Sequence, residues 1–159
     1  MNEFALARVL HVLGVVLWIG GVAFVTTVLL PAVRDFRSDA ERVDFFENVE
    51  SRFARQARLS TLLTGASGFW LTSLLGGWGR FGTLAGWWMA AMMVVWAVFT
   101  LMLFVLEPLV LHRWFRDQAR RDPRGTFARI VFLHRVLLGI SLITVAGAVA
   151  GSHGWLIGV

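Results

Sequence analysis

Few ionisable side chains lie within or beside the apolar stretches of this sequence, and four of them are candidates for chemistry: His11, Glu107, His112 and His134. Burying an ionisable group in an apolar medium is costly, so such residues usually mark a functional site. Imidazole can ligate a metal ion or a haem iron, and a carboxylate can relay protons or bind a cation. A fifth residue, His153 in the sequence Gly-Ser-His-Gly-Trp, is expected to be a plain boundary residue.

His11 is followed by Gly14, Trp18 and Gly21, which share its face if the segment is a helix. The two glycines have no side chain, so they leave space beside the imidazole. This space would admit either a flat macrocycle or another helix. Arg8 lies one turn further out on the same face, where it could pair with a haem propionate or with a lipid phosphate. We therefore expect His11, Arg8 and Gly14 to belong to a cofactor site.

His112 ends the third apolar run and His134 begins the fourth, so antiparallel neighbouring helices would bring them to a similar depth. Arg113, Arg135 and Arg58 lie at the same level in the sequence pattern. Two imidazoles from different helices, with arginines for the propionates, are typical of a b-type haem in a helical bundle. The alternative is that both histidines anchor or cap helix ends.

Glu107 is the one acidic residue within an apolar run, and Pro108 after it loosens the helix by removing a backbone donor. A proton or ion relay is the functional interpretation. A structural ion pair with Arg135 or Arg58 is the alternative.

Three methionines, Met89, Met92 and Met93, are expected near the depth of His11. Thioether sulfur is a ligand for Cu(I) and for haem iron. Methionine also fills gaps between helices without any ligand.

These candidates must be positioned by four long apolar runs, at about residues 9–30, 59–75, 84–111 and 130–157. A bilayer core needs about 20 apolar residues per helix. The 57% hydrophobic composition and the mean hydropathy of +0.70 leave too little polar surface for a water-soluble fold. The sequence predicts an all-α, four-transmembrane-helix bundle, with residues 1–159 as a single membrane domain and no cleaved signal peptide.

All fifteen basic residues are Arg, and thirteen of them lie between the first and second runs or between the third run and the start of the fourth. Positive residues mark cytoplasmic segments, so both termini are expected outside the cell, in a bacterial inner membrane. The net charge of +5 is then a topology signal and does not indicate nucleic-acid binding. The absence of Cys excludes disulfides and thiolate metal ligands.

The connection from Pro31 to Arg58 has a helical apolar stripe formed by Val43, Phe45, Phe46, Val49 and Phe53. Ser38 and Glu41 have the spacing of a capping box at its start. We expect an amphipathic interfacial helix that continues into the second span, with Arg52, Arg55 and Arg58 at the level of the lipid headgroups.

The fourth run carries two pairs of small residues at a spacing of four, Ala146 with Ala150 and Gly147 with Gly151. Such pairs allow close helix contacts in membranes. They predict tight packing of this helix within the bundle or in a homodimer.

Several short motifs resemble the membrane domain of copper resistance protein D (CopD): Leu10-His11-Val12 with Trp18-Ile19-Gly20-Gly21, and Arg52-Phe53-Ala54-Arg55 with Leu63-Thr64-Gly65. The same skeleton is similar to that of HemJ-type protoporphyrinogen oxidase. The CopD resemblance implies copper handling, and the HemJ resemblance implies a bound haem with His11 as a ligand. HemJ-type proteins also use a Lys in the third helix, where this chain has Met89 to Met93, so the resemblance implies haem binding rather than protoporphyrinogen oxidation.

The sequence thus predicts a membrane protein that binds one or two b-type haems through His11, His112 and His134 and passes electrons to or from a quinone or a redox partner protein. Copper transport or sensing through His11 and the methionines is the alternative. A third interpretation is a non-catalytic membrane subunit or assembly factor. The lipid bilayer is the expected environment in each case.

Overall fold

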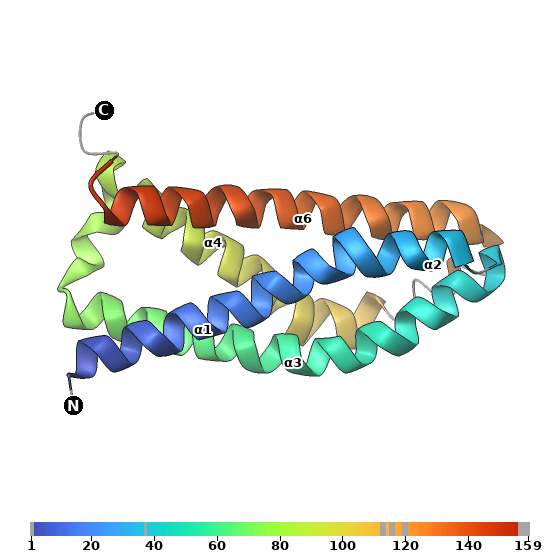
Figure 1. Ribbon diagram of the computed structural model, residues 1–159, viewed down its shortest axis with the longest axis horizontal. Coiled ribbons are helices and arrows are strands. Elements are labelled where there is room, and N and C mark those ends of the chain that lie inside the picture. The colour runs from blue at the N-terminus through green and yellow to red at the C-terminus, as the bar shows by residue number, and fades with distance from the viewer. Residues whose placement is uncertain (1, 37, 112–113, 115–116, 119–120, 156–159) are drawn as a thin grey trace.

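The computed structural model describes residues 2–36, 38–111, 114, 117–118 and 121–155, and every regular element in them is helical. The elements are α1 (Glu3–Phe24), the π-helical η1 (Val25–Leu29), α2 (Leu30–Phe36), α3 (Asp39–Leu74), the short 3-10 helices η2 (Gly77–Gly82) and η3 (Leu84–Gly86), α4 (Trp87–Leu101), the π-helical η4 (Met102–Leu111) and α6 (Pro123–Ser152). The long helices lie side by side, and the start of α1 and the end of α6 share one end of the bundle (Figure 1).

Within the described residues, three helical stretches are long and apolar enough to cross a membrane: Glu3–Asp35, Leu84–Leu109 and Pro123–Ser152. The first contains the first predicted apolar run, and the other two cover most of the third and fourth. This finding confirms the prediction of an all-α protein with several membrane-spanning helices. The remaining predicted run, 59–75, forms the C-terminal half of α3 and is not among the three.

The predicted connecting helix and the second apolar run form one continuous helix of 36 residues, α3. Ser38 is its N-cap, and the Ser38 hydroxyl donates to the Glu41 carboxylate at 2.5 Å instead of accepting from the backbone. The two capping-box residues therefore meet, with a different hydrogen bond from the one that the motif implies.

The apolar stripe of the N-terminal half of α3 contacts protein. Phe46 is only 1% exposed and packs with Val25 and Leu30 on one side and with Phe127 and Ile130 of α6 on the other. Phe45 and Phe53 are partly buried against the same cluster. Burial in the bundle therefore explains the stripe that suggested an interfacial helix.

A second core cluster joins α1, α4 and α6. Its centre is Trp18, which meets the ring of Phe99 edge-on with the centroids 4.9 Å apart. Val95 and Leu138 are buried beside them. The two clusters together hold α1 between the other long helices.

Glycines allow close contacts between the helices. A Cβ at Gly14 would lie 2.5 Å from Thr64 Oγ1 of α3, and one at Gly21 would overlap the ring of Phe53. The space beside these glycines is therefore occupied by α3, which is the helix-packing alternative that the sequence left open. Gly14 contacts protein and offers no open face to a macrocycle.

The small residues of α6 also pack within the bundle. A Cβ at Gly147 would lie 2.7 Å from the indole of Trp87, and one at Gly151 would overlap the indole of Trp88. Trp88 is itself held by a hydrogen bond from Nε1 to the carbonyl of Ala85 at 3.1 Å. These contacts account for one small-residue pair without a second copy of the chain.

We predict that Gly151→Ala destabilises the protein by about 1–3 kcal/mol, because the added methyl group overlaps a fixed, buried indole. Gly139→Ala, on the same helix, is the matched control. A Cβ at Gly139 meets nothing within 4 Å, so this change should be neutral or slightly stabilising through helix propensity. Thermal unfolding of both variants in one detergent measures the difference, and equal stabilities would contradict the α4–α6 contact.

Candidate functional site

His11 of α1 lies against α3, and its ring is fixed by the backbone of that helix. His11 Nδ1 is 3.0 Å from the carbonyl oxygen of Thr64 and 3.3 Å from Ser67 Oγ. A carbonyl oxygen can only accept, so Nδ1 carries the hydrogen and, in the neutral imidazole, Nε2 carries the lone pair. Gly68 makes room for the ring, because a Cβ there would lie 3.1 Å from His11 Cε1. His11 therefore has the tautomer of a metal or haem ligand.

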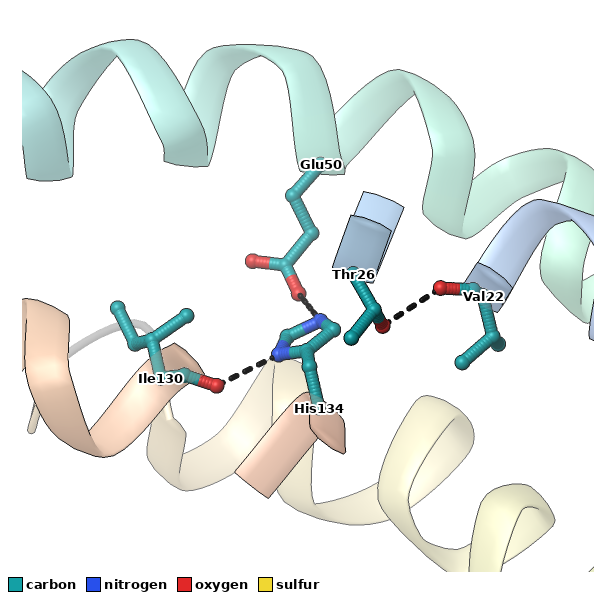
Figure 2. A network of polar contacts seen from close by, with 5 residues as sticks. All are labelled: Val22, Thr26, Glu50, Ile130 and His134. Atoms are coloured by element: carbon teal, nitrogen blue, oxygen red, sulfur yellow. Dashed lines mark hydrogen bonds and ion pairs between the residues drawn. The ribbon is translucent and has the colours of Figure 1, made fainter. Parts of the chain in front are cut away.

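His134 of α6 has the same protonated nitrogen. Its Nδ1 is 2.9 Å from the carbonyl oxygen of Ile130, one turn earlier in the helix. Its Nε2 faces Glu50 of α3, with Nε2 and Oε1 3.8 Å apart, as Figure 2 shows. The ring of Phe46 packs edge-on against the imidazole, with the centroids 5.5 Å apart. His134 Nε2 thus has a carboxylate as its neighbour, which forms an ion pair when the imidazole is protonated.

A cavity of about 40 Å³ lies between α1, α3, α4, η4 and α6. Its lining is mostly apolar but includes Glu50, Glu107, His134 and Trp18. Trp18 is 4% exposed, and its Nε1 has no hydrogen-bond partner among the residues that the structure describes. Since one water needs roughly 10–15 Å³ in such a measure, the cavity has room for a few water molecules beside these polar groups.

Glu107 is paired with Arg58 of α3, with Arg58 Nη2 and Glu107 Oε1 3.2 Å apart. This is one of the two structural pairings that the sequence suggested for Glu107. The Glu107 side chain is 14% exposed and the Arg58 side chain 32%, so the pair is only partly screened by solvent. Glu107 also lines the cavity beside His134, so its carboxylate lies at a polar site within the bundle.

Arg58 also replaces a missing hydrogen-bond donor in η4. In a π-helix the N–H of a residue donates to the carbonyl five residues earlier. Pro108 has no N–H, so the carbonyl of Leu103 lacks the donor that this pattern would supply. Arg58 Nε donates to that carbonyl at 3.0 Å. One guanidinium therefore satisfies both the backbone oxygen freed by Pro108 and the neighbouring carboxylate.

Of the predicted haem ligands, His11 and His134 are not brought together. His134 shares its cavity with Val22, which is eleven residues after His11 and so about 17 Å along the helix. The two imidazoles therefore cannot bind one iron. His112 and Arg113 lie outside the described residues, so the pairing of His112 with His134 stays a prediction. Within the described chain no group of three or more His, Cys, Asp and Glu side chains could hold a metal ion.

The other predicted residues lie near the surface or in packing contacts. The guanidinium of Arg8 lies 5.9 Å from the centre of the Phe4 ring, and Arg135 is exposed. Met89 is buried, and its methyl group would lie 3.4 Å from a Cβ at Gly77. His153 is exposed at the end of α6, with its Nδ1 2.8 Å from the carbonyl oxygen of Val149.

Sequence reasoning missed Glu50 and the groups that hold His11. Glu50 follows Phe46 by four residues and precedes Phe53 by three, so helical periodicity places it on the buried face. That signal was present in the sequence. The contact of His11 with the Thr64 carbonyl had no signal, because a backbone acceptor is available at every residue.

Comparison with protein-family models, curated protein sequences and solved structures finds no match. The described fold and its polar sites define the chain as a helical protein with several helices able to span a membrane.

We predict that Arg58→Met lowers the free energy of unfolding by about 1–3 kcal/mol, because it leaves the Leu103 carbonyl and the Glu107 carboxylate without this partner. In that background Pro108→Ala should restore a helix donor to Leu103. Pro108→Ala should therefore stabilise the Arg58→Met protein more than it stabilises the parent protein.

The exposed Arg55 supplies the control, since Arg55→Met should change stability by less than about 0.5 kcal/mol. Chemical or thermal unfolding of the four proteins of the cycle gives the coupling energy. A coupling of zero between positions 58 and 108 would show that Arg58 does not replace the missing donor.

Proposed function

We propose that this chain is a four-span membrane protein that binds one b-type haem through His11 and takes part in electron transfer at the membrane. The observation that carries the proposal is the hydrogen bond from His11 Nδ1 to the Thr64 carbonyl, because it leaves Nε2 as the ligand atom. A haem bound there would supply one-electron redox chemistry.

The distribution of polar groups on α3 supports a membrane span in its C-terminal half, which is the second of the four proposed spans. Five of its hydroxyl side chains are buried: Ser60, Thr61, Thr64, Ser67 and Thr72 are all less than 10% exposed. Four of them donate to a carbonyl of the preceding turn, which satisfies these four hydroxyls within the helix. The outward face carries Leu59 and Leu62, at 71% and 50% exposure. A helix with polar groups inside and leucines outside suits a lipid environment, and its inward hydroxyls lower its mean hydropathy.

The arginines support the proposed orientation in a bacterial inner membrane. Arg34 of α2 and Arg42 near the start of α3 belong to the end of the bundle where α2 ends and α3 begins (Figure 1), and Arg52 and Arg58 follow further along α3. Arg8 and Arg80 belong to the opposite end, in α1 and η2. The positive-inside rule then favours a cytoplasmic position for the first end and an outside position for both termini.

A cysteine at Ser38 should be labelled from the cytoplasmic side only, and a cysteine at Gly79 from the outside only, because these positions lie at opposite ends of α3. Both are exposed, and the parent chain has no Cys, so each variant carries a single reactive thiol. Labelling of intact and inverted membrane vesicles with an impermeant maleimide measures the sides. Two cysteines labelled from the same side would contradict the second span.

His11 and His134 differ in their fit to haem. His134 Nε2 faces a carboxylate and borders a cavity of about 40 Å³, whereas cofactor pockets measure about 300–1,000 Å³. The residues around His134 therefore do not fit a porphyrin. At His11 the tautomer fits and the ring is partly exposed. Since α3 fills the face beside Gly14, the proposed haem would lie against the outer surface of the bundle.

Copper binding is the second candidate, favoured by the position of Met89. A Cβ at Gly77 would lie close to both the Met89 methyl group and the Thr72 side chain, and Thr72 bonds to the carbonyl of Gly68. Gly68 contacts the His11 ring. Met89 and His11 therefore approach α3 about one helical turn apart, and a Cu(I) ion takes imidazole and thioether ligands.

His11→Ala should remove the cofactor, because a methyl group cannot replace an imidazole ligand. His153→Ala is the matched control, since this exposed histidine only caps α6. Haem is measured by the Soret band and by pyridine haemochrome, and copper by elemental analysis, each per folded protein in detergent. Loss of haem supports the first candidate, and loss of copper the second. Full cofactor content in His11→Ala would reject His11 as the ligand, and a parent protein with neither cofactor would favour a non-catalytic membrane subunit.

A further inference from the structure

One face of α3 changes from cationic to apolar at a single point along the helix. Asn48, Ser51, Arg52 and Arg55 share this face with Arg58, at helical spacings of three and four residues. The same face continues with Leu59 and Leu62 and then with Phe69, which are 71%, 50% and 37% exposed. The boundary between the two parts lies between Arg58 and Leu59.

The cationic part lines an open groove of about 600 Å³, bounded by Asn48, Ser51, Arg52, Arg55, Arg58 and Glu107. The single carboxylate of the groove is already paired with Arg58. Arg52 and Arg55 are exposed and form no ion pair with any other described residue. Two positive charges therefore remain uncompensated in the groove, next to hydroxyl and amide side chains.

We propose that this groove binds the phosphate headgroup of an anionic phospholipid, whose acyl chains lie along Leu59 and Leu62. A guanidinium group can donate two parallel hydrogen bonds to phosphate oxygens, and Ser51 and Asn48 add neutral hydrogen-bonding groups. The inference rests on the membrane position proposed above for α3 and is independent of any cofactor at His11.

The apolar part of the face selects a lipid over a free phosphate ion. Inorganic phosphate would contact the arginines equally well, but it would leave the exposed leucines beside the groove uncovered. A phospholipid covers both parts at once, because its phosphate and its acyl chains are joined at the distance of one membrane interface. The change of polarity at Arg58 and Leu59 places the phosphate plane there.

The experiment uses the full chain in phosphatidylcholine bilayers with spin-labelled phosphatidylglycerol or spin-labelled phosphatidylcholine. The motionally restricted fraction of each spectrum gives the relative association constant of the two lipids. We expect phosphatidylglycerol to be preferred, and we expect Arg52→Gln and Arg55→Gln each to reduce the preference about five-fold. Arg121→Gln with Arg129→Gln, which removes two exposed charges that do not line the groove, should leave it nearly unchanged.

Two further measurements separate the outcomes. Inorganic phosphate, added at constant ionic strength, should not displace the lipid, and displacement at millimolar phosphate would mean a phosphate site instead. A spin label on Leu62→Cys should be accessible to oxygen and protected from a water-soluble nickel complex. Failure of that label test would reject the membrane position of α3. A lipid-exposed label without any preference for phosphatidylglycerol would reject the lipid site alone. The same conclusion would follow if the control variant lost as much of the preference as Arg52→Gln and Arg55→Gln.

Discussion

The face of α3 that meets α1 constrains the rest of the bundle, because a helix surrounded by lipid must satisfy its polar groups internally. The hydroxyls of Ser60, Thr64 and Ser67 bond to carbonyls of their own helix, so they add volume without adding unsatisfied donors. The Thr64 carbonyl can then accept from His11 with its second lone pair. Gly14 brings the two backbones close enough for this contact. The orientation of the imidazole is therefore a result of helix packing.

The two π-helical segments lie beside the polar groups of the other half of the molecule. Thr26 of η1 donates to Val22, which lines the same cavity as His134 and Glu50, and η4 carries Glu107. A π-helical turn leaves carbonyls with altered partners, and such turns are frequent at functional sites. In η4 the carbonyl of Leu103 accepts a hydrogen bond from Arg58 of α3, so the local backbone of η4 depends on α3. Removing Arg58 would therefore affect a helix to which it is not connected in sequence.

Periodicity and charge predicted the features that are set by the local sequence of a single segment. The apolar runs, the continuity of the 39–58 connection with the next run and the pairing of Glu107 with a nearby arginine all follow from residue type and spacing. The partner of each face could not be predicted in the same way. The stripe through Phe46 suits lipid and protein equally, and its packing against α6 depends on the register between helices distant in sequence. Gly14 was ambiguous for the same reason, since a cleared face accepts a helix as well as a macrocycle.

His11 and His134 show why the same side chain does not imply the same chemistry. Both donate Nδ1–H to a backbone carbonyl, so both have Nε2 as the reactive nitrogen. At His11 the ring contacts glycine and hydroxyl groups of α3, and ligation of a metal would need no neighbouring charge to move. At His134 a carboxylate already faces Nε2, so a metal ion bound there would have that carboxylate as a neighbour. The two imidazoles therefore differ in what faces Nε2, and the spacing along α1 keeps the two sites separate.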